Sequence, residues 1–152
     1  MHDDCAAGVC DAGICILSCP ADWDMINLEP VEGRDEWRYS GSTTLLESNA
    51  TGSCGGGVAD QVHRFVPAVG GRFGFEVIGR DRMLRMPVVH LRTSCLAPQS
   101  EVACEVQLDP YIALTANLEA GAPVYLFIDG SDALEGGSRG DYGLRISPYG
   151  EP

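Results

Sequence analysis

Short apolar runs follow one another from residue 61 onward, and clusters of Gly, Pro, Asp and Ser separate them. The runs are rich in Val, Ile, Thr, Tyr and Phe, the residue types that favour β-strands. In one of them, Phe73, Phe75 and Val77 alternate with Gly74 and Glu76. The pattern predicts strands over 61–66, 72–78, 88–93, 101–108, 112–118, 124–129 and 142–147, with 38–46 as an additional candidate.

This spacing of strands predicts the fold class. No stretch sustains the 3.6-residue apolar period of a long amphipathic helix. We therefore expect an all-β protein, an antiparallel jelly roll or β-sandwich of about 7–9 strands. Residues 1–24 form a cysteine-rich N-terminal segment in this interpretation, and 25–152 form the sandwich domain. No apolar run reaches the roughly 18 residues that a membrane-spanning helix needs.

Charge narrows the range of partners. Acidic residues outnumber basic ones 22 to 10, a formal net charge of −12, and every basic residue is an arginine. Such a chain is a poor partner for nucleic acid or an anionic membrane, since both are bound through Lys and Arg. The acidity is uneven, because residues 1–36 hold nine acids and one arginine, a net of −8, and the remaining 116 residues carry −4.

Seven cysteines in 152 residues indicate an oxidising compartment. Residues 1–5 have neither the basic nor the apolar region of a signal peptide, so the prediction of a secreted or cell-surface protein rests on the cysteines. Cys95 and Cys104 flank a turn between two predicted strands, where adjacent antiparallel strands would bring them within bridging distance. We expect them to form a disulfide.

The other five cysteines lie earlier in the chain. Cys5, Cys10, Cys15 and Cys19 are spaced C-x4-C-x4-C-x3-C, which fits two local disulfides better than a zinc site, because zinc favours C-x2-C pairs. Cys54 is then left over. It is expected to be free and buried, to link to a second chain, or to pair with an N-terminal cysteine and displace one there.

Acidic residues near the end of the chain are candidate calcium ligands. Asp129, Asp132, Glu135 and Asp141 offer carboxylate oxygens, although their spacing is not that of an EF-hand loop. The structural alternative is a strand-ending Asp-Gly turn at Asp129. A second cluster of carboxylates is found near the N-terminus, at Asp3, Asp4, Asp11, Asp22 and Asp24.

A local excess of arginine suggests an anion or partner patch. Arg80, Arg82 and Arg85 lie close together around Asp81, and guanidinium groups bind carboxylates bidentately. Such a patch would fit an anionic polysaccharide or an acidic protein. The alternative is that it faces the acidic N-terminal third of the same chain or of a neighbouring copy. The stretch 64–92, which contains these three arginines, also holds Arg64, Arg72 and Arg92.

The sequence contains no motif of a known catalytic centre. There is no G-x-S-x-G, no H-E-x-x-H and no glycine loop in a nucleotide-binding context. His63 and His90 fall within predicted strands, where a packing role is the expected one. We therefore expect no catalytic residues, no cofactor other than a candidate Ca²⁺, and no enzymatic activity.

Two parts of the chain resemble domains of secreted bacterial proteins. Region 52–147 resembles the pre-peptidase C-terminal domain group, in the form abundant in secreted myxobacterial proteins. Its carriers are Ser53-Cys54-Gly55-Gly56-Gly57, Asp60-Gln61-Val62-His63-Arg64-Phe65, Leu91-Arg92-Thr93-Ser94-Cys95, Val124-Tyr125-Leu126-Phe127-Ile128-Asp129-Gly130 and Gly140-Asp141-Tyr142-Gly143-Leu144-Arg145-Ile146. The N-terminus resembles a short myxobacterial cysteine-rich repeat, carried by Cys5-x-x-Gly8-x-Cys10-Asp11-x-Gly13, Cys15 and Cys19-Pro20-x-Asp22.

The resemblance implies a jelly-roll sandwich without catalytic residues, appended to exported proteins, with calcium bound in some related collagenase modules. Together with the residues, it predicts a non-catalytic binding or adhesion module that acts at a cell surface or on an extracellular polymer. The partner would be an extracellular protein, a polysaccharide or a second copy of the chain. The alternatives are a structural subunit of an extracellular assembly, such as a filament or surface layer, and an accessory domain of a secreted hydrolase.

Overall fold

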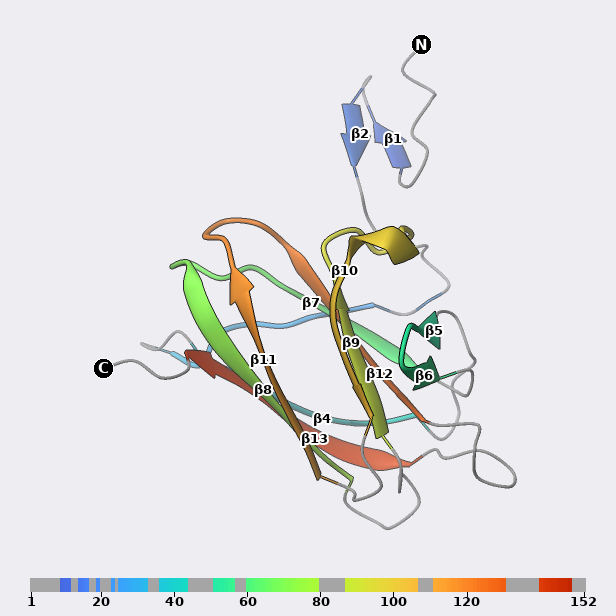
Figure 1. Cartoon of the computed structure of the whole chain (residues 1–152). Coiled ribbons are helices and arrows are strands. Elements are labelled where there is room, and N and C mark those ends of the chain that lie inside the picture. Colours follow the sequence, from blue (N-terminus) through green and yellow to red (C-terminus); the bar gives the residue numbers. More distant parts are fainter. Residues whose placement is uncertain are drawn as a thin grey trace.

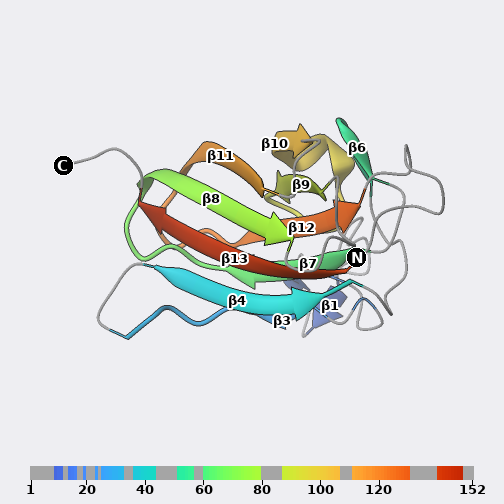
Figure 2. The same cartoon turned by 90° about the horizontal axis from the view of Figure 1, so that it is seen from below.

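Two sheets pack face to face in the computed structural model (Figures 1 and 2), and all their strand pairs are antiparallel except the short pair of β3 with β7. The structure describes residues 9–11, 14–16, 19, 23, 25–32, 36–43, 51–56, 60–79, 87–106, 111–130 and 140–148. The five-stranded sheet has the order β10-β9-β12-β7-β3, formed by Glu101–Val106, Pro87–Arg92, Val124–Gly130, Gln61–Phe65 and Ile26–Asn27. The four-stranded sheet has the order β11-β8-β13-β4, formed by Tyr111–Leu118, Gly71–Gly79, Asp141–Pro148 and Trp37–Ser42.

The predicted β-sandwich is confirmed, and each of the eight predicted strands overlaps an observed one. The sequence pattern missed β3, which has only two residues and pairs with β7 in parallel through Ile26 and His63. Two small hairpins complete the structure, β1–β2 (Val9–Asp11 and Ile14–Ile16) and β5–β6 (Thr51–Gly52 and Gly55–Gly56), together with the short 3-10 helix η2 (Pro98–Ser100). Among the described residues, no helix is long and apolar enough to cross a membrane.

The core lies between the two sheets and follows directly from the alternation in the sequence. Phe73, Phe75 and Val77 project inward from β8, and all are at most 2 % exposed. Trp37 of β4 packs against Phe65 of β7, with ring centroids 5.1 Å apart. Burying large side chains of this kind stabilises the sandwich by roughly 1.5–3 kcal/mol each.

One polar side chain is built into this core. His63 has zero exposed area, and its Nδ1 lies 3.1 Å from the Leu126 carbonyl oxygen while its Nε2 lies 2.7 Å from the Tyr142 hydroxyl. Because the carbonyl only accepts, Nδ1 donates to it and Nε2 accepts from the hydroxyl. Burial lowers the pKa of His63 to about 4, so the ring is neutral at pH 7. The packing role expected for this histidine is confirmed.

Candidate binding face

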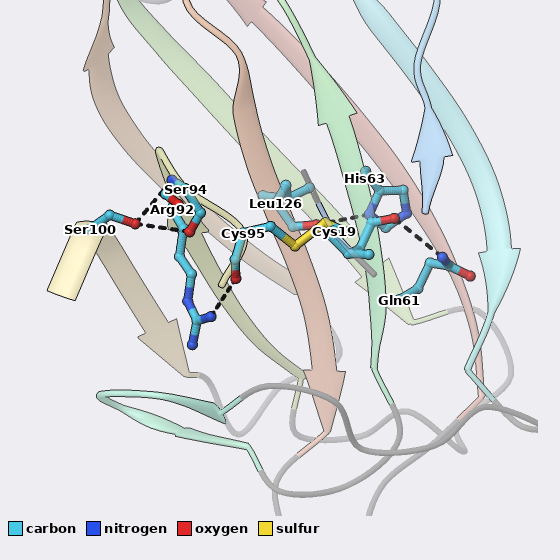
Figure 3. Close-up of a disulfide and its surroundings, with 9 residues drawn as sticks. Cys19, Gln61, His63, Arg92, Ser94, Cys95, Ser100 and Leu126 are labelled. Carbon is cyan, nitrogen blue, oxygen red and sulfur yellow. Dashed lines mark hydrogen bonds between the residues drawn. A yellow bond between two sulfur atoms is a disulfide. The ribbon is translucent and has the colours of Figure 1, made fainter. Parts of the chain in front are cut away.

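Residues that precede the first sandwich strand cover part of the outer face of the five-stranded sheet. Val62, Tyr125 and Phe127 project outward from this sheet and are at most 2 % exposed. Cys19, Trp23 and Met25 pack over them, with the Trp23 ring edge-on to Phe127 at 6.2 Å. A disulfide between Cys19 and Cys95 holds this cover in place (Figure 3), with the Cα atoms 5.2 Å apart and 76 residues of separation.

A second disulfide fastens the β5–β6 hairpin to the same face. Cys54 pairs with Cys104 across 50 residues, and the Cys54 N–H donates to Cys104 Sγ at 3.0 Å. The hairpin approaches so closely that a Cβ on Gly52 would lie 2.8 Å from both Cys104 Sγ and His90 Nδ1. The Ser53 backbone N–H donates to the Glu101 carboxylate at 2.9 Å. A side chain at position 52 would therefore force the hairpin, Cys104 or the His90 ring to move.

The observed pairings correct the predicted ones. The Cys95–Cys104 bridge is wrong because Cys104 lies opposite His90 in the β9–β10 register, whereas Cys95 lies in the turn beyond β9. The two are thus several residues apart along the ladder, outside bridging distance. Cys54 is neither free nor available to a second chain, and Cys19 does not take part in a local N-terminal pair. Of the remaining cysteines, Cys5 lies outside the described residues, and only the backbone of Cys10 and Cys15 is described.

Ionisable groups are buried beneath these two covers. The His90 ring stacks on Phe127 at 4.6 Å, and neither ring nitrogen has a hydrogen-bond partner among the described residues. Burial and the neighbouring Arg92 lower its pKa to about 4, while Glu101 acts in the opposite direction. The Arg92 guanidinium lies 5.1 Å from the centre of the Phe127 ring and donates to the Cys95 carbonyl at 2.7 Å. The expected packing role of His90 is therefore met by ring stacking, not by hydrogen bonds.

The outer face of the four-stranded sheet, called here the binding face, is open. Its outward side chains form rows across the strands, because residues paired in an antiparallel register point to the same side. The first row is Tyr111, Ile78, Gly143 and Ser40. The second row is Ala113, Glu76, Arg145 and Arg38. The third row is Thr115, Gly74 and Ser147.

Charged side chains make a ridge of the second row. Arg145 donates from Nε to Glu36 Oε2 and from Nη1 to Glu76 Oε1, both at 3.1 Å. Arg38 Nε donates to the same Glu36 oxygen at 2.6 Å. The two arginines face each other in the register, and the shared carboxylate offsets their repulsion. Hydrogen bonds from both guanidinium groups lower the pKa of Glu36 to about 2. We call Glu36, Arg38, Glu76 and Arg145 the charged ridge.

A groove lies on each side of the ridge. The first, of about 460 Å³, follows the row of Gly143 and Ser40 and has Tyr111 and Ile78 at one end. The second, of about 530 Å³, follows Gly74 and Ser147 and is bordered by Arg72 and Thr115. Glu76 and Arg145 border both grooves. Glycine and serine leave space on a sheet surface where larger side chains would fill it, so these small residues create the two hollows.

Most predicted site residues lie away from this face. Asp129 is fully buried and accepts the Gly130 N–H at 2.7 Å. The predicted turn is not observed at this position, because Asp129 and Gly130 both lie within β12 and pair with Val88 and Pro87 of β9. Asp141 is exposed at the start of β13. The remaining candidates, Asp132, Glu135, Arg80, Arg82 and Arg85, lie outside the described residues, as do Asp3, Asp4, Asp22 and Asp24. The described part of the chain holds no cluster of three or more His, Cys, Asp or Glu that would bind a metal ion, so calcium binding stays a prediction.

Sequence reasoning missed the charged ridge and Tyr111. The available signal was the alternation itself, because Glu76 and Arg145 occupy the polar positions of strands whose other positions are apolar. Which strands lie side by side was the missing information. Without the strand order, nothing in the sequence indicates that Glu36, Glu76 and Arg145 lie together.

Comparisons with known proteins indicate the fold. No protein-family model matches the chain, and the search of curated proteins found no match. The periplasmic inhibitor of g-type lysozyme (PliG) from Aeromonas hydrophila superposes with a TM-score of 0.56 and 11 % identity, covering 81 % of this chain and 94 % of that one. The surface-associated copper-binding protein CorA of Methylomicrobium album BG8 gives 0.50 and 6 %, covering 82 % and 97 %.

The pre-peptidase C-terminal domain of Bacillus anthracis collagenase is also similar, with a TM-score of 0.48 and 18 % identity over 81 % of this chain and 92 % of that one. At these identities the likeness concerns the fold and not the function. The sandwich that the pre-peptidase resemblance implies is present, whereas the myxobacterial relationship and the cysteine-rich repeat stay predictions. The chain is a disulfide-linked β-sandwich with one covered and one open outer face.

Proposed function

We propose that this protein is a non-catalytic, exported binding module that holds an extracellular polymer or protein on the binding face. The observation that carries the proposal is the difference between the two outer faces, one buried under disulfide-linked segments and the other open with two grooves. Ligand sites are concave and place a few polar groups at fixed positions. Arg145 and Glu76 meet this description because each is held by a defined partner between the grooves.

Three further observations support export and a binding role. Two disulfides connect distant parts of the chain, and such bonds persist in oxidising compartments. Both described histidines within strands are neutral at pH 7, and neither faces a groove. In addition, the structurally similar protein PliG from Aeromonas hydrophila is described as a periplasmic inhibitor of g-type lysozyme.

A co-sedimentation assay tests the proposal. The labelled chain is mixed with insoluble cellulose, chitin, xylan, peptidoglycan sacculi or collagen fibrils, and the bound fraction is measured. A variant with both grooves filled, Ser40→Trp with Ser147→Trp, should lose the binding that wild type shows. The control is Val69→Ser, at a residue that is 63 % exposed and lines neither groove. Binding that is equal in wild type and the filled variant, or absent from the whole panel, would contradict the proposal.

A further inference from the structure

We infer that the binding face takes a neutral polysaccharide, whose chain lies across the strands along the grooves. The inference rests on the proposed function and names the class of ligand for the same face. Four features of the described residues carry it: the groove floors, the charge balance of the ridge, the apolar end of the first groove, and the dimensions of the rows.

Small residues form the floors of both grooves. Gly143 and Ser40 lie side by side in the first groove, and Gly74 and Ser147 do so in the second. An extended peptide would gain affinity from separate pockets for alternate side chains or from an unpaired strand edge. Gly74, Gly143 and Ser147 lie on the central strands β8 and β13, which are paired on both sides, whereas Ser40 lies on the edge strand β4. Most of the floor therefore offers no unpaired strand edge. A polymer of flat rings fits such a surface better.

The charged ridge offers hydrogen bonds without a net charge. Its two arginines and two glutamates are paired with one another, and the side chains of Arg145 and Glu76 are 45 % and 43 % exposed. Sugar hydroxyls both donate and accept, so a row of alternating donors and acceptors suits them. An anionic polymer would have to compete with Glu36 and Glu76 for the guanidinium groups of the ridge. Arg72, which borders the second groove, already donates to Thr115 Oγ1 at 3.1 Å. The chain's net charge of −12 would also repel such a polymer.

The first groove has an apolar end. Tyr111 and Ile78 are paired in the register and are 44 % and 43 % exposed. The Tyr111 hydroxyl donates to Glu76 Oε2 at 3.1 Å, which fixes the ring beside the groove before any ligand arrives. A preorganised aromatic ring costs little entropy on binding. The C–H face of a sugar ring would pack against this surface while its hydroxyl groups reach the ridge.

The rows have the dimensions of an oligosaccharide. Strands in a sheet lie about 4.8 Å apart, so the first row spans roughly 14 Å from β11 to β4. The two grooves are four residues apart along β13, which corresponds to about 13 Å. A single sugar would fill only part of either groove. A chain of several sugars would contact the ridge and the apolar end together.

Affinity electrophoresis tests the inference. The native chain is run through gels that contain hydroxyethyl cellulose, β-1,3-glucan, galactomannan, xylan or, as the anionic probe, polygalacturonate. We expect retardation in at least one neutral gel and none with polygalacturonate. Added salt should leave the retardation unchanged, because no net charge is neutralised on binding. Tyr111→Ala should weaken the affinity about tenfold, as for an aromatic hot spot, and Val69→Ser should leave it unchanged.

The outcomes separate this inference from the proposed function. If no neutral gel retards the chain while collagen co-sediments with it through the same face, the inference fails and the proposed function holds. If Tyr111→Ala and Ser40→Trp are retarded as strongly as wild type, the ligand binds elsewhere and both fail. Retardation by polygalacturonate alone would also overturn the neutral ligand.

Discussion

The two outer faces of this sandwich differ in their exposure to solvent, although the strands of both sheets show the same alternation of inward and outward residues. On the five-stranded sheet the outward residues include Phe127 and Tyr125, which need cover, and two disulfides hold that cover in place. On the four-stranded sheet they are charged or small, and they remain in solvent around two grooves. If the open face binds a ligand as proposed, stability and recognition depend on different residues, because the disulfide-linked cover lies on the opposite face.

Removing the cover should produce the largest loss of stability. We expect Cys19→Ala with Cys95→Ala to lower the free energy of unfolding by about 4 kcal/mol, because the bond closes a long loop. The melting temperature should fall by roughly 10 °C for a domain of this size. Calorimetry of the non-reduced protein measures it. An unchanged melting temperature would show that the N-terminal segment stays in place without the bond.

Acid should weaken the molecule through its two buried histidines. The pKa values of His63 and His90 are about 4 in the folded chain and about 6.5 when unfolded. Between these values the unfolded state binds more protons, so stability is fully present above pH 6.5 and is lost as the pH falls towards 4. Each histidine contributes a loss of up to about 3 kcal/mol.

The variant His90→Phe separates the two contributions. It removes the titrating group beneath the cover and also two ring nitrogens that lack partners among the described residues. Urea titrations at pH 7 and pH 5 should therefore show a smaller acid loss than in wild type. His63→Phe is the matched comparison, and it should lower stability at pH 7 because it breaks two hydrogen bonds. Equal acid losses in wild type and His90→Phe would mean that His90 is protonated in the folded state.

A single methyl group should disturb the close contact of the β5–β6 hairpin. In Gly52→Ala the new Cβ would lie 2.8 Å from Cys104 Sγ and from the His90 ring, so the hairpin must move outward. We expect a destabilisation of about 1–3 kcal/mol, as for other overpacked sites. Chemical denaturation measures it. Ser53→Ala on the same hairpin is the comparison, and it should have a smaller effect because it removes only the exposed hydrogen bond from Ser53 Oγ to Glu101. A neutral effect of Gly52→Ala would indicate that the cover is loosely held.

The smallest effect on stability should come from the binding face. Glu76→Gln removes one ion pair with Arg145, whose side chain is 45 % exposed and keeps Glu36 as a partner. Exposed pairs of this kind contribute less than about 1 kcal/mol. The same variant should weaken ligand binding, because the carboxylate borders both grooves. A large loss of stability in Glu76→Gln would contradict the view that the open face contributes little to the free energy of unfolding.

The strands could be predicted from the sequence because burial between two sheets requires alternation. Phe73, Phe75 and Val77 show this period directly, and β8 contains all three. The disulfides could not be predicted. The predicted Cys95–Cys104 pair assumed a symmetric hairpin, whereas β10 pairs with β9 from Glu101 opposite Arg92, with a register shift after it. That register places Cys104 opposite His90. Cys95 lies in the turn beyond the paired residues and forms its disulfide with Cys19.

The all-β class and the inward faces of the strands could be read from the sequence alone. Both follow from local alternation, which needs no knowledge of neighbouring strands. The covered face, the cysteine pairs and the meeting of Glu36, Glu76 and Arg145 on one ridge became known only from the arrangement of the strands in space. The physical reason is that strand order and register bring together residues up to 109 positions apart, and nothing local specifies them.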